Sequence, residues 1–244
     1  MPRPHTTWRW IISCLMLGST GGFIRVASTA EGIPPEDVTY RSMAEALQVP
    51  DKVHFLNLSH QDLKVLPATI GQLIHLQTLQ AAGNQFTTLP QELGRCTALI
   101  TLDLRSNRFR EVPSVIGQLR SLRTLDLNNN QLVRLSPAIG QLTRVTALFV
   151  ANNQLRSLPR EIGNMSSLAF LIIDNNQLAS LPETLGQLNN LHEILAFNNR
   201  LTRLPATLAQ LPHLSKLWVS RNPIPPAEQQ RWRTSLPNVD VQFE

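Results

Sequence analysis

The fold of this chain is decided by a 23-residue stretch, Leu99–Ser121, which reads LITLDLRSNRFREVPSVIGQLRS. The next 23 residues, Leu122–Arg144, read LRTLDLNNNQLVRLSPAIGQLTR and keep their apolar, asparagine, proline and glycine residues at nearly the same places. The pattern extends in both directions without an insertion or deletion. Its first apolar position is taken in eight successive units by Val53, Leu76, Leu99, Leu122, Val145, Leu168, Leu191 and Leu214. A fixed period of this length predicts stacked structural repeats rather than one globular core.

The start of each unit alternates between apolar and other residues, which predicts a short β-strand. In the quoted unit Leu102 and Leu104 would point into the core, while Thr101, Asp103 and Arg105 would point outward. One unit cannot bury its apolar face alone. We therefore expect successive strands to lie side by side, about 4.8 Å apart, in a parallel sheet.

The second half of each unit must return the chain behind the sheet. A proline suits the turn there, and a glycine recurs at the following corner, where a tight approach or a positive φ is expected. Ala209 replaces glycine in the last return. The repeated glycines are Gly71, Gly94, Gly117, Gly140, Gly163 and Gly186.

An asparagine recurs where each strand ends and the chain turns. An amide side chain at this place can satisfy backbone groups that would otherwise be buried without a hydrogen-bond partner, so the series is interpreted as structural. The first unit carries Gln61 instead. The series is Asn84, Asn107, Asn130, Asn153, Asn176, Asn199 and Asn222.

The motif L-x-x-L-x-L-x-x-N-x-L-x-x-L-P-x-x-I-G-Q resembles the leucine-rich repeat family over about residues 53–226, in particular secreted bacterial members. The resemblance implies an α/β fold. It implies a horseshoe-shaped leucine-rich repeat solenoid with a parallel β-sheet on the concave face and short helical or irregular returns on the convex face. It also implies an asparagine ladder along the stack and partner binding on the concave face.

The first 30 residues have the pattern of a signal peptide. Arg3 and Arg9 give a basic start, residues 10–24 are mostly apolar, and the small residues 28–30 precede Glu31. The apolar run is short and rich in Gly, Ser and Thr, so we expect no membrane span. We expect an exported protein that is secreted, periplasmic or at the cell surface, with a cytoplasmic location as the alternative.

The rest of the chain divides into the repeats and their two ends. Residues 31–52 are interpreted as a linker and N-terminal cap, with Ser42 capping a short helix over residues 43–47. Residues 53–226 hold the eight repeats. Residues 227–244 form a C-terminal cap, in which a helix places Trp232 against the last layer and a closing strand follows.

Charge and composition exclude several function classes. Three of the 22 Lys and Arg residues and none of the 17 Asp and Glu residues fall in the first 30 positions, so the remainder carries only a small basic excess. No dense basic stripe is present, and nucleic-acid binding is not expected. Histidines are scattered over different repeat positions, and no nucleophile–base or metal-ligand motif occurs. We expect no enzyme activity, cofactor, metal or small-molecule substrate.

The outward position four residues after the start of each unit changes character along the chain. It reads Asn57, Gln80, Asp103, Asp126, Phe149, Ile172, Leu195 and Trp218. The second half predicts an exposed apolar patch with a charged surround, and such patches commonly mark interfaces. The predicted partner-binding residues are Phe149, Phe170, Ile172, Glu193, Leu195, Phe197, Lys216 and Trp218.

The sequence therefore predicts a non-enzymatic protein–protein recognition module, monomeric or weakly self-associating, that binds a protein partner on its concave face. Two alternatives stay open. One is an intracellular scaffold of the Ras-associated leucine-rich repeat type, and the other is a cell-surface glycan binder whose aromatic rings stack on sugars.

Overall fold

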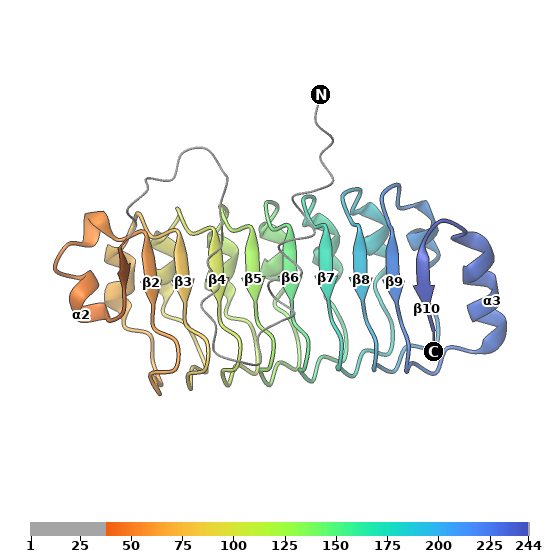
Figure 1. Ribbon diagram of the computed structural model, residues 1–244, viewed down its shortest axis with the longest axis horizontal. Helices are drawn as coiled ribbons and strands as arrows, with labels where there is room; N and C mark the ends of the chain where they lie inside the picture. The colour runs from red at the N-terminus through yellow and green to blue at the C-terminus, as the bar shows by residue number, and fades with distance from the viewer. Residues whose placement is uncertain (1–37, 244) are drawn as a thin grey trace, which may run out of the picture. The chain divides into compact units, whose positions relative to one another are not determined.

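A computed structural model describes residues 38–243. These residues form one ten-stranded parallel sheet in which the strands lie side by side in chain order (Figure 1). The strands are β1 (Thr39–Tyr40), β2 (Phe55–Asn57), β3 (Thr78–Gln80), β4 (Thr101–Asp103), β5 (Thr124–Asp126), β6 (Ala147–Phe149), β7 (Phe170–Ile172), β8 (Glu193–Leu195), β9 (Lys216–Trp218) and β10 (Asp240–Gln242).

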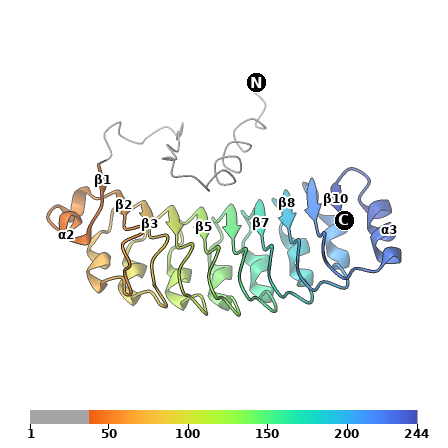
Figure 2. The same cartoon turned by 60° about the horizontal axis from the view of Figure 1, so that its bottom comes forward.

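Short 3₁₀ helices form the second layer, behind the sheet. Figure 2 shows the strands along the inner side of a shallow arc and the helices along its outer side. This is the predicted solenoid, with an open and only gently curved sheet. The 3₁₀ helices are η1 (Pro50–Lys52), η2 (Ala68–Gln72), η3 (Gln91–Arg95), η4 (Ser114–Gln118), η5 (Pro137–Gln141), η6 (Arg160–Asn164), η7 (Glu183–Gln187) and η8 (Ala206–Gln210).

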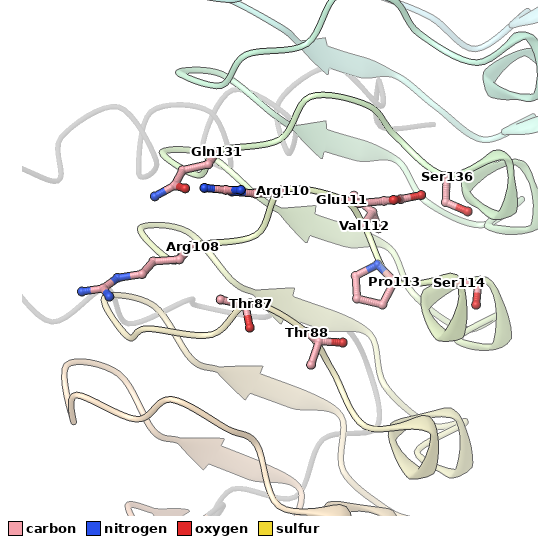
Figure 3. A pocket seen from close by; sticks show the side chains of 10 residues that line it. All are labelled: Thr87, Thr88, Arg108, Arg110, Glu111, Val112, Pro113, Ser114, Gln131 and Ser136. Atoms are coloured by element: carbon pink, nitrogen blue, oxygen red, sulfur yellow. The ribbon is translucent and has the colours of Figure 1, made fainter.

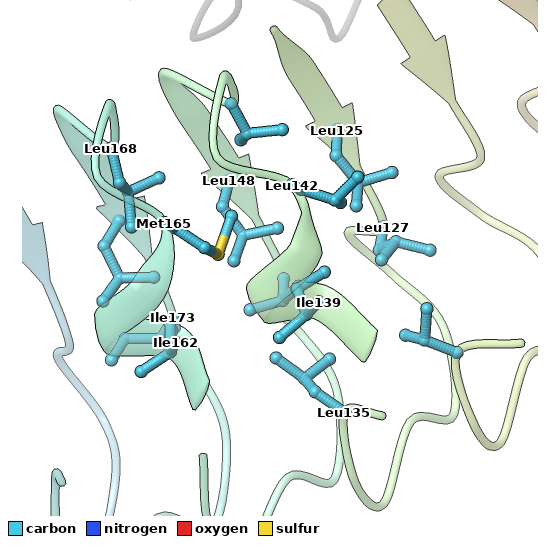
Figure 4. Close-up of a cluster of buried hydrophobic side chains, with 14 of the residues drawn as sticks. Leu125, Leu127, Leu135, Ile139, Leu142, Leu148, Ile162, Met165, Leu168 and Ile173 are labelled. Atoms are coloured by element: carbon cyan, nitrogen blue, oxygen red, sulfur yellow. The ribbon is translucent and has the colours of Figure 1, made fainter. Parts of the chain in front are cut away.

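The core is a continuous row of aliphatic layers between the sheet and the 3₁₀ helices. Leu102 and Leu104 are completely buried, as the alternation predicts. Figure 4 shows how one layer packs on the next: Leu125 and Leu148 come from neighbouring strands, and Ile139 comes from the helix behind them. Parallel pairing keeps the repeats in register, for example Leu125 opposite Leu148. Each repeat therefore buries its leucines against the same leucines of its neighbours.

The repeated asparagines form the predicted ladder. The Asn153 Nδ2 group donates to the carbonyl of Leu127 at 3.0 Å and to that of Val150 at 3.0 Å. Its Oδ1 accepts a hydrogen bond from the backbone N–H of Leu132 at 2.9 Å. One side chain thus ties its own repeat to the preceding one through groups that water cannot reach. In the first unit Gln61 instead donates to the Arg41 carbonyl in the N-terminal cap, at 2.7 Å.

The repeated glycines serve close packing, which is one of the two predicted reasons for them; the other, a positive φ, is not found at these corners. Among the glycines in the described range, Gly83 has a positive φ, of 65°. At Gly71 a Cβ would lie 2.7 Å from the Glu92 carbonyl oxygen in the next repeat. Positive φ values occur instead on the residue before each ladder asparagine, such as Asn152 at 55°. Asparagine is one of the few non-glycine residues that tolerates this conformation.

Both ends of the solenoid are covered. The helix α2 (Met43–Ala46) begins after Ser42, whose side chain accepts a hydrogen bond from the Glu45 N–H at 3.2 Å. The helix α3 (Pro226–Ser235) places Trp232 in the core, and β10 closes the sheet beside β9. Residues 39–40, interpreted as linker, form β1 and pair with β2. The predicted signal peptide, residues 1–30, lies outside the described residues.

We predict that Leu148→Ala lowers the free energy of unfolding by about 2–5 kcal/mol, because it leaves a cavity in a completely buried layer. Denaturant unfolding followed by circular dichroism measures this. The control is Val133→Ala, since Val133 is 39% exposed and its truncation leaves no cavity. Equal losses in the two variants would contradict the layered core.

We also predict that Asn153→Ala costs about 1–3 kcal/mol, because the substitution leaves the buried Leu132 N–H without its acceptor and removes one of the two amide donors to each of the Leu127 and Val150 carbonyls. The same unfolding measurement applies. The matched control, Asn189→Ala, removes an exposed asparagine outside the ladder and should change stability by less than about 0.5 kcal/mol.

Candidate partner-binding face

The strand register brings most of the predicted partner-binding residues into two adjoining columns. One column pairs Phe149 with Ile172, Ile172 with Leu195, and Leu195 with Trp218. In the other column, Phe170 pairs with Glu193 and Glu193 with Lys216. Phe197 lies beyond the end of β8, two residues after Leu195. We call these eight residues, six apolar and two charged, the apolar patch. They lie on the outward face of β6–β9.

The patch is less accessible than its sequence predicts. Four side chains are almost buried, with exposed fractions of 6% for Phe149, 5% for Phe170, 7% for Ile172 and 2% for Leu195. The expectation of open exposure is therefore wrong for them. Adjacent parallel strands are only about 4.8 Å apart, so large side chains in one column cover one another's flanks. Phe197 and Trp218 remain partly exposed.

Trp218 is held in place by polar contacts on both sides. Its Nε1–H donates to the Asp240 carboxylate of β10 at 2.9 Å. The Lys216 ammonium lies over its ring, 4.9 Å from the ring centroid, and also contacts the Glu193 carboxylate at 3.0 Å. Cation–π contact and ion pair together fix the orientation of the indole. The C-terminal end of the patch is thus a preorganised aromatic residue with a charged border.

The outward face carries paired and unpaired carboxylates, in its polar half at Asp103 and Asp126 and at the end of β7 at Asp174. Asp103 forms an ion pair with Arg105 at 3.1 Å. Its register neighbour Asp126 accepts one hydrogen bond, from the Asn128 N–H at 2.9 Å. Burial, reinforced by the nearby Asp103 charge, raises the pKa of Asp126 to about 7. Burial likewise raises the pKa of Asp174 to about 7, against the opposing effect of its hydrogen bond from the Phe197 N–H.

The sequence identified Asp126 as an outward residue, but it did not indicate that Asp126 and Asp174 are buried. Nor did it indicate which carboxylates acquire a cation. Arg105 lies two residues after Asp103 on the same chain segment, a spacing that could have suggested that pair. The Glu193–Lys216 pair depends on the one-repeat offset of 23 residues, which the repeat register supplies.

Hollows lined mostly by polar residues lie between the return turns. A cavity of about 870 Å³ lies beside Arg108 and Arg110, and Figure 3 shows hydroxyl groups and these guanidinium groups around it. Glu111, on its rim, is engaged by Arg134 at 2.7 Å. In residues 38–243 no group of three His, Cys, Asp or Glu side chains is arranged to hold a metal.

Cys96 occupies the place that leucine takes in other repeats and behaves as a small buried apolar residue. It is completely buried, and its Sγ lies 3.3 Å from the Ile70 carbonyl oxygen. Burial raises the pKa of its thiol to about 11, so the reactive thiolate is disfavoured. Among the helices of the described residues, none is long and apolar enough to cross a membrane.

Comparisons with known proteins agree with this architecture. A family model described as a leucine-rich repeat region matches residues 91–172. A leucine-rich repeat protein of Leptospira interrogans is 34% identical, with a TM-score of 0.68; the match covers 83% of this chain and 57% of that one. This chain thus spans little more than half of that relative. No curated protein sequence matches.

Two further solved structures are similar. Internalin C2 of Listeria monocytogenes is 25% identical, with a TM-score of 0.69, over 80% of this chain and 82% of that one. A plant peptide hormone receptor, RGFR1, in complex with RGF2, is 27% identical, with a TM-score of 0.68, over 85% of this chain and 34% of the receptor. The unbroken period, the stacked parallel strands and these similarities identify the chain as a leucine-rich repeat protein.

Proposed function

We propose that this protein is an exported, non-enzymatic recognition module that binds a protein partner through the outward face of β6–β9. The observation that carries the proposal is the change along the outward column. The inward leucines and the asparagine ladder repeat almost unchanged through the solenoid, whereas the outward column turns from polar or acidic to large and apolar after Asp126. A stable core does not require this change, because β3–β5 build the same scaffold with polar outward residues.

The fold supports a binding role. A row of short parallel strands offers a long, rigid surface whose outward side chains vary independently of the core. The similar plant receptor was solved in complex with RGF2. Aromatic residues anchored in a fixed orientation are typical of interface hot spots, and Trp218 is held in this way by Asp240 and Lys216.

The glycan-binding alternative is less well supported. Stacking on a sugar needs an open aromatic face, but Phe149 and Phe170 are almost buried. The Lys216 ammonium lies over the Trp218 ring and competes for that surface. A protein segment can use the partly exposed edges of Phe197 and Trp218 together with the charged groups beside them.

We predict that Phe197→Ser combined with Trp218→Ser reduces partner capture from the native source by at least about tenfold, equivalent to ~1.4 kcal/mol of binding energy. Both side chains are partly exposed, so the loss of stability should be smaller than in Leu148→Ala. Quantitative affinity capture with the purified protein measures the first effect, and thermal unfolding measures the second.

The matched control is Asn57→Ser with Gln80→Ser, which changes the corresponding outward column in the polar half. Capture should be unchanged in this control. Undiminished capture by the Phe197→Ser/Trp218→Ser variant would contradict binding through the patch.

Export is tested separately by mass spectrometry of the N-terminus of the native protein. A mature chain that begins at Glu31 is expected for a cleaved signal peptide. An intact N-terminal segment in a cytoplasmic fraction would favour the intracellular scaffold instead.

A further inference from the structure

Two buried carboxylates border the apolar patch without a cation. Asp126 is 4% exposed and Asp174 is 5% exposed. Each accepts one hydrogen bond from a backbone N–H, at 2.9 Å and 2.8 Å respectively. Within residues 38–243 neither forms an ion pair. A carboxylate has about four lone-pair positions, and buried carboxylates are normally paired with a cation.

Two further outward carboxylates, one in the patch and one on β4, show that pairing is possible on this face. Asp103 has Arg105 at 3.1 Å, and Glu193 has Lys216 at 3.0 Å. The lack of an ion pair is therefore specific to Asp126 and Asp174 and is not shared by all the outward carboxylates. Both lie directly against the patch: Asp126 is opposite Phe149 in the strand register, and Asp174 follows Ile172 at the end of β7.

We propose that the patch binds an extended protein segment in which basic side chains alternate with apolar ones, one arginine or lysine reaching Asp126 and another reaching Asp174. The inference rests on the proposed function and specifies the chemistry of the partner. Charge complementarity carries it, because cationic side chains supply the hydrogen-bond donors and the charge that both buried carboxylates lack.

The geometry also sets the spacing of the basic residues. Asp126 and Asp174 are two strands and two residues apart, which corresponds to about 12 Å. An extended segment advances about 3.3 Å per residue, and every second side chain points to the same side. Basic residues four positions apart fit this distance, and the side chain midway between them faces the patch. The expected motif is basic–x–apolar–x–basic.

Binding of such a segment should depend on pH. The groups near Asp126 are the Asp103 carboxylate, which raises its pKa, and Arg105, which lowers it; the effect on Asp174 comes from burial and the Phe197 N–H. With both pKa values at about 7, each carboxylate is mostly neutral at pH 6 and mostly charged at pH 8. A cation binds the charged form, so affinity should fall from pH 8 to pH 6 by up to about tenfold per carboxylate.

The experiment is a selection of random 12-residue peptides displayed on phage against the purified protein at pH 8. We predict enrichment of the basic–x–apolar–x–basic motif. The affinity of a selected peptide, measured by isothermal titration calorimetry, should fall at least tenfold in Asp126→Asn/Asp174→Asn. Asparagine keeps an acceptor for both backbone N–H groups, so this variant should retain the folded circular dichroism spectrum.

A control, Glu161→Gln, removes one carboxylate from η6 on the opposite side of the solenoid and should leave peptide affinity unchanged. If the selected peptides lack basic residues and bind the Phe197→Ser/Trp218→Ser variant more weakly, this inference is overturned. The proposed function is supported in that case, because binding still depends on the patch. A selection that yields no patch-dependent peptide would count against both. A dimer of this protein that occupies the patch and is not displaced by basic peptides would also overturn the inference.

Discussion

The structure depends on one constraint: no repeat can bury its own leucines. A three-residue strand such as β5 and a five-residue 3₁₀ helix such as η5 enclose too little volume to exclude water from Leu125 and Ile139. Only the next repeat, in the same register, completes the layer. The identical spacing of 23 residues follows from this requirement, because an inserted residue would displace the leucines of one repeat from those of the next.

The asparagine ladder and the close-packed glycines serve the same constraint. Stacking brings backbone carbonyls of successive turns into a region without water, and Asn153 supplies donors and an acceptor to two repeats at once. On the other side, Gly71 lets the Glu92 backbone approach more closely than any side chain would allow. Both residues act between repeats, so their contacts form only when the repeats are stacked.

The outward face is free of that constraint, which is why it can specialise. Strands β3–β5 and β6–β9 share one scaffold, yet their outward side chains differ in size and charge. The unusual features of the face lie in its apolar part or beside it: the almost buried aromatic and aliphatic residues, the fixed Trp218, and the unpaired Asp126 and Asp174. A protein-binding role and a basic partner segment are the interpretations that these features support together.

Much of the fold could be predicted from the sequence, because the position of a residue within the 23-residue unit indicates whether it faces the core or points outward. The period and the alternation of Leu102 and Leu104 predict the parallel sheet, and the placement of Asn153 at the turn predicts that its amide satisfies buried backbone groups; the ladder along the stack was implied by the family resemblance. The outward columns follow from the same alternation. The conformation of the glycines could not be predicted in this way, because a close backbone approach and a positive φ both favour glycine.

By itself, then, the sequence determined the solenoid, its register and which side chains face outward, since these depend on local period and polarity. Only the tertiary structure decided how accessible those side chains are and which of them find partners. Burial depends on what lies beside a residue across several strands, and pairing depends on distances between groups one repeat apart. Those distances leave Asp126 without a cation while Glu193 acquires Lys216.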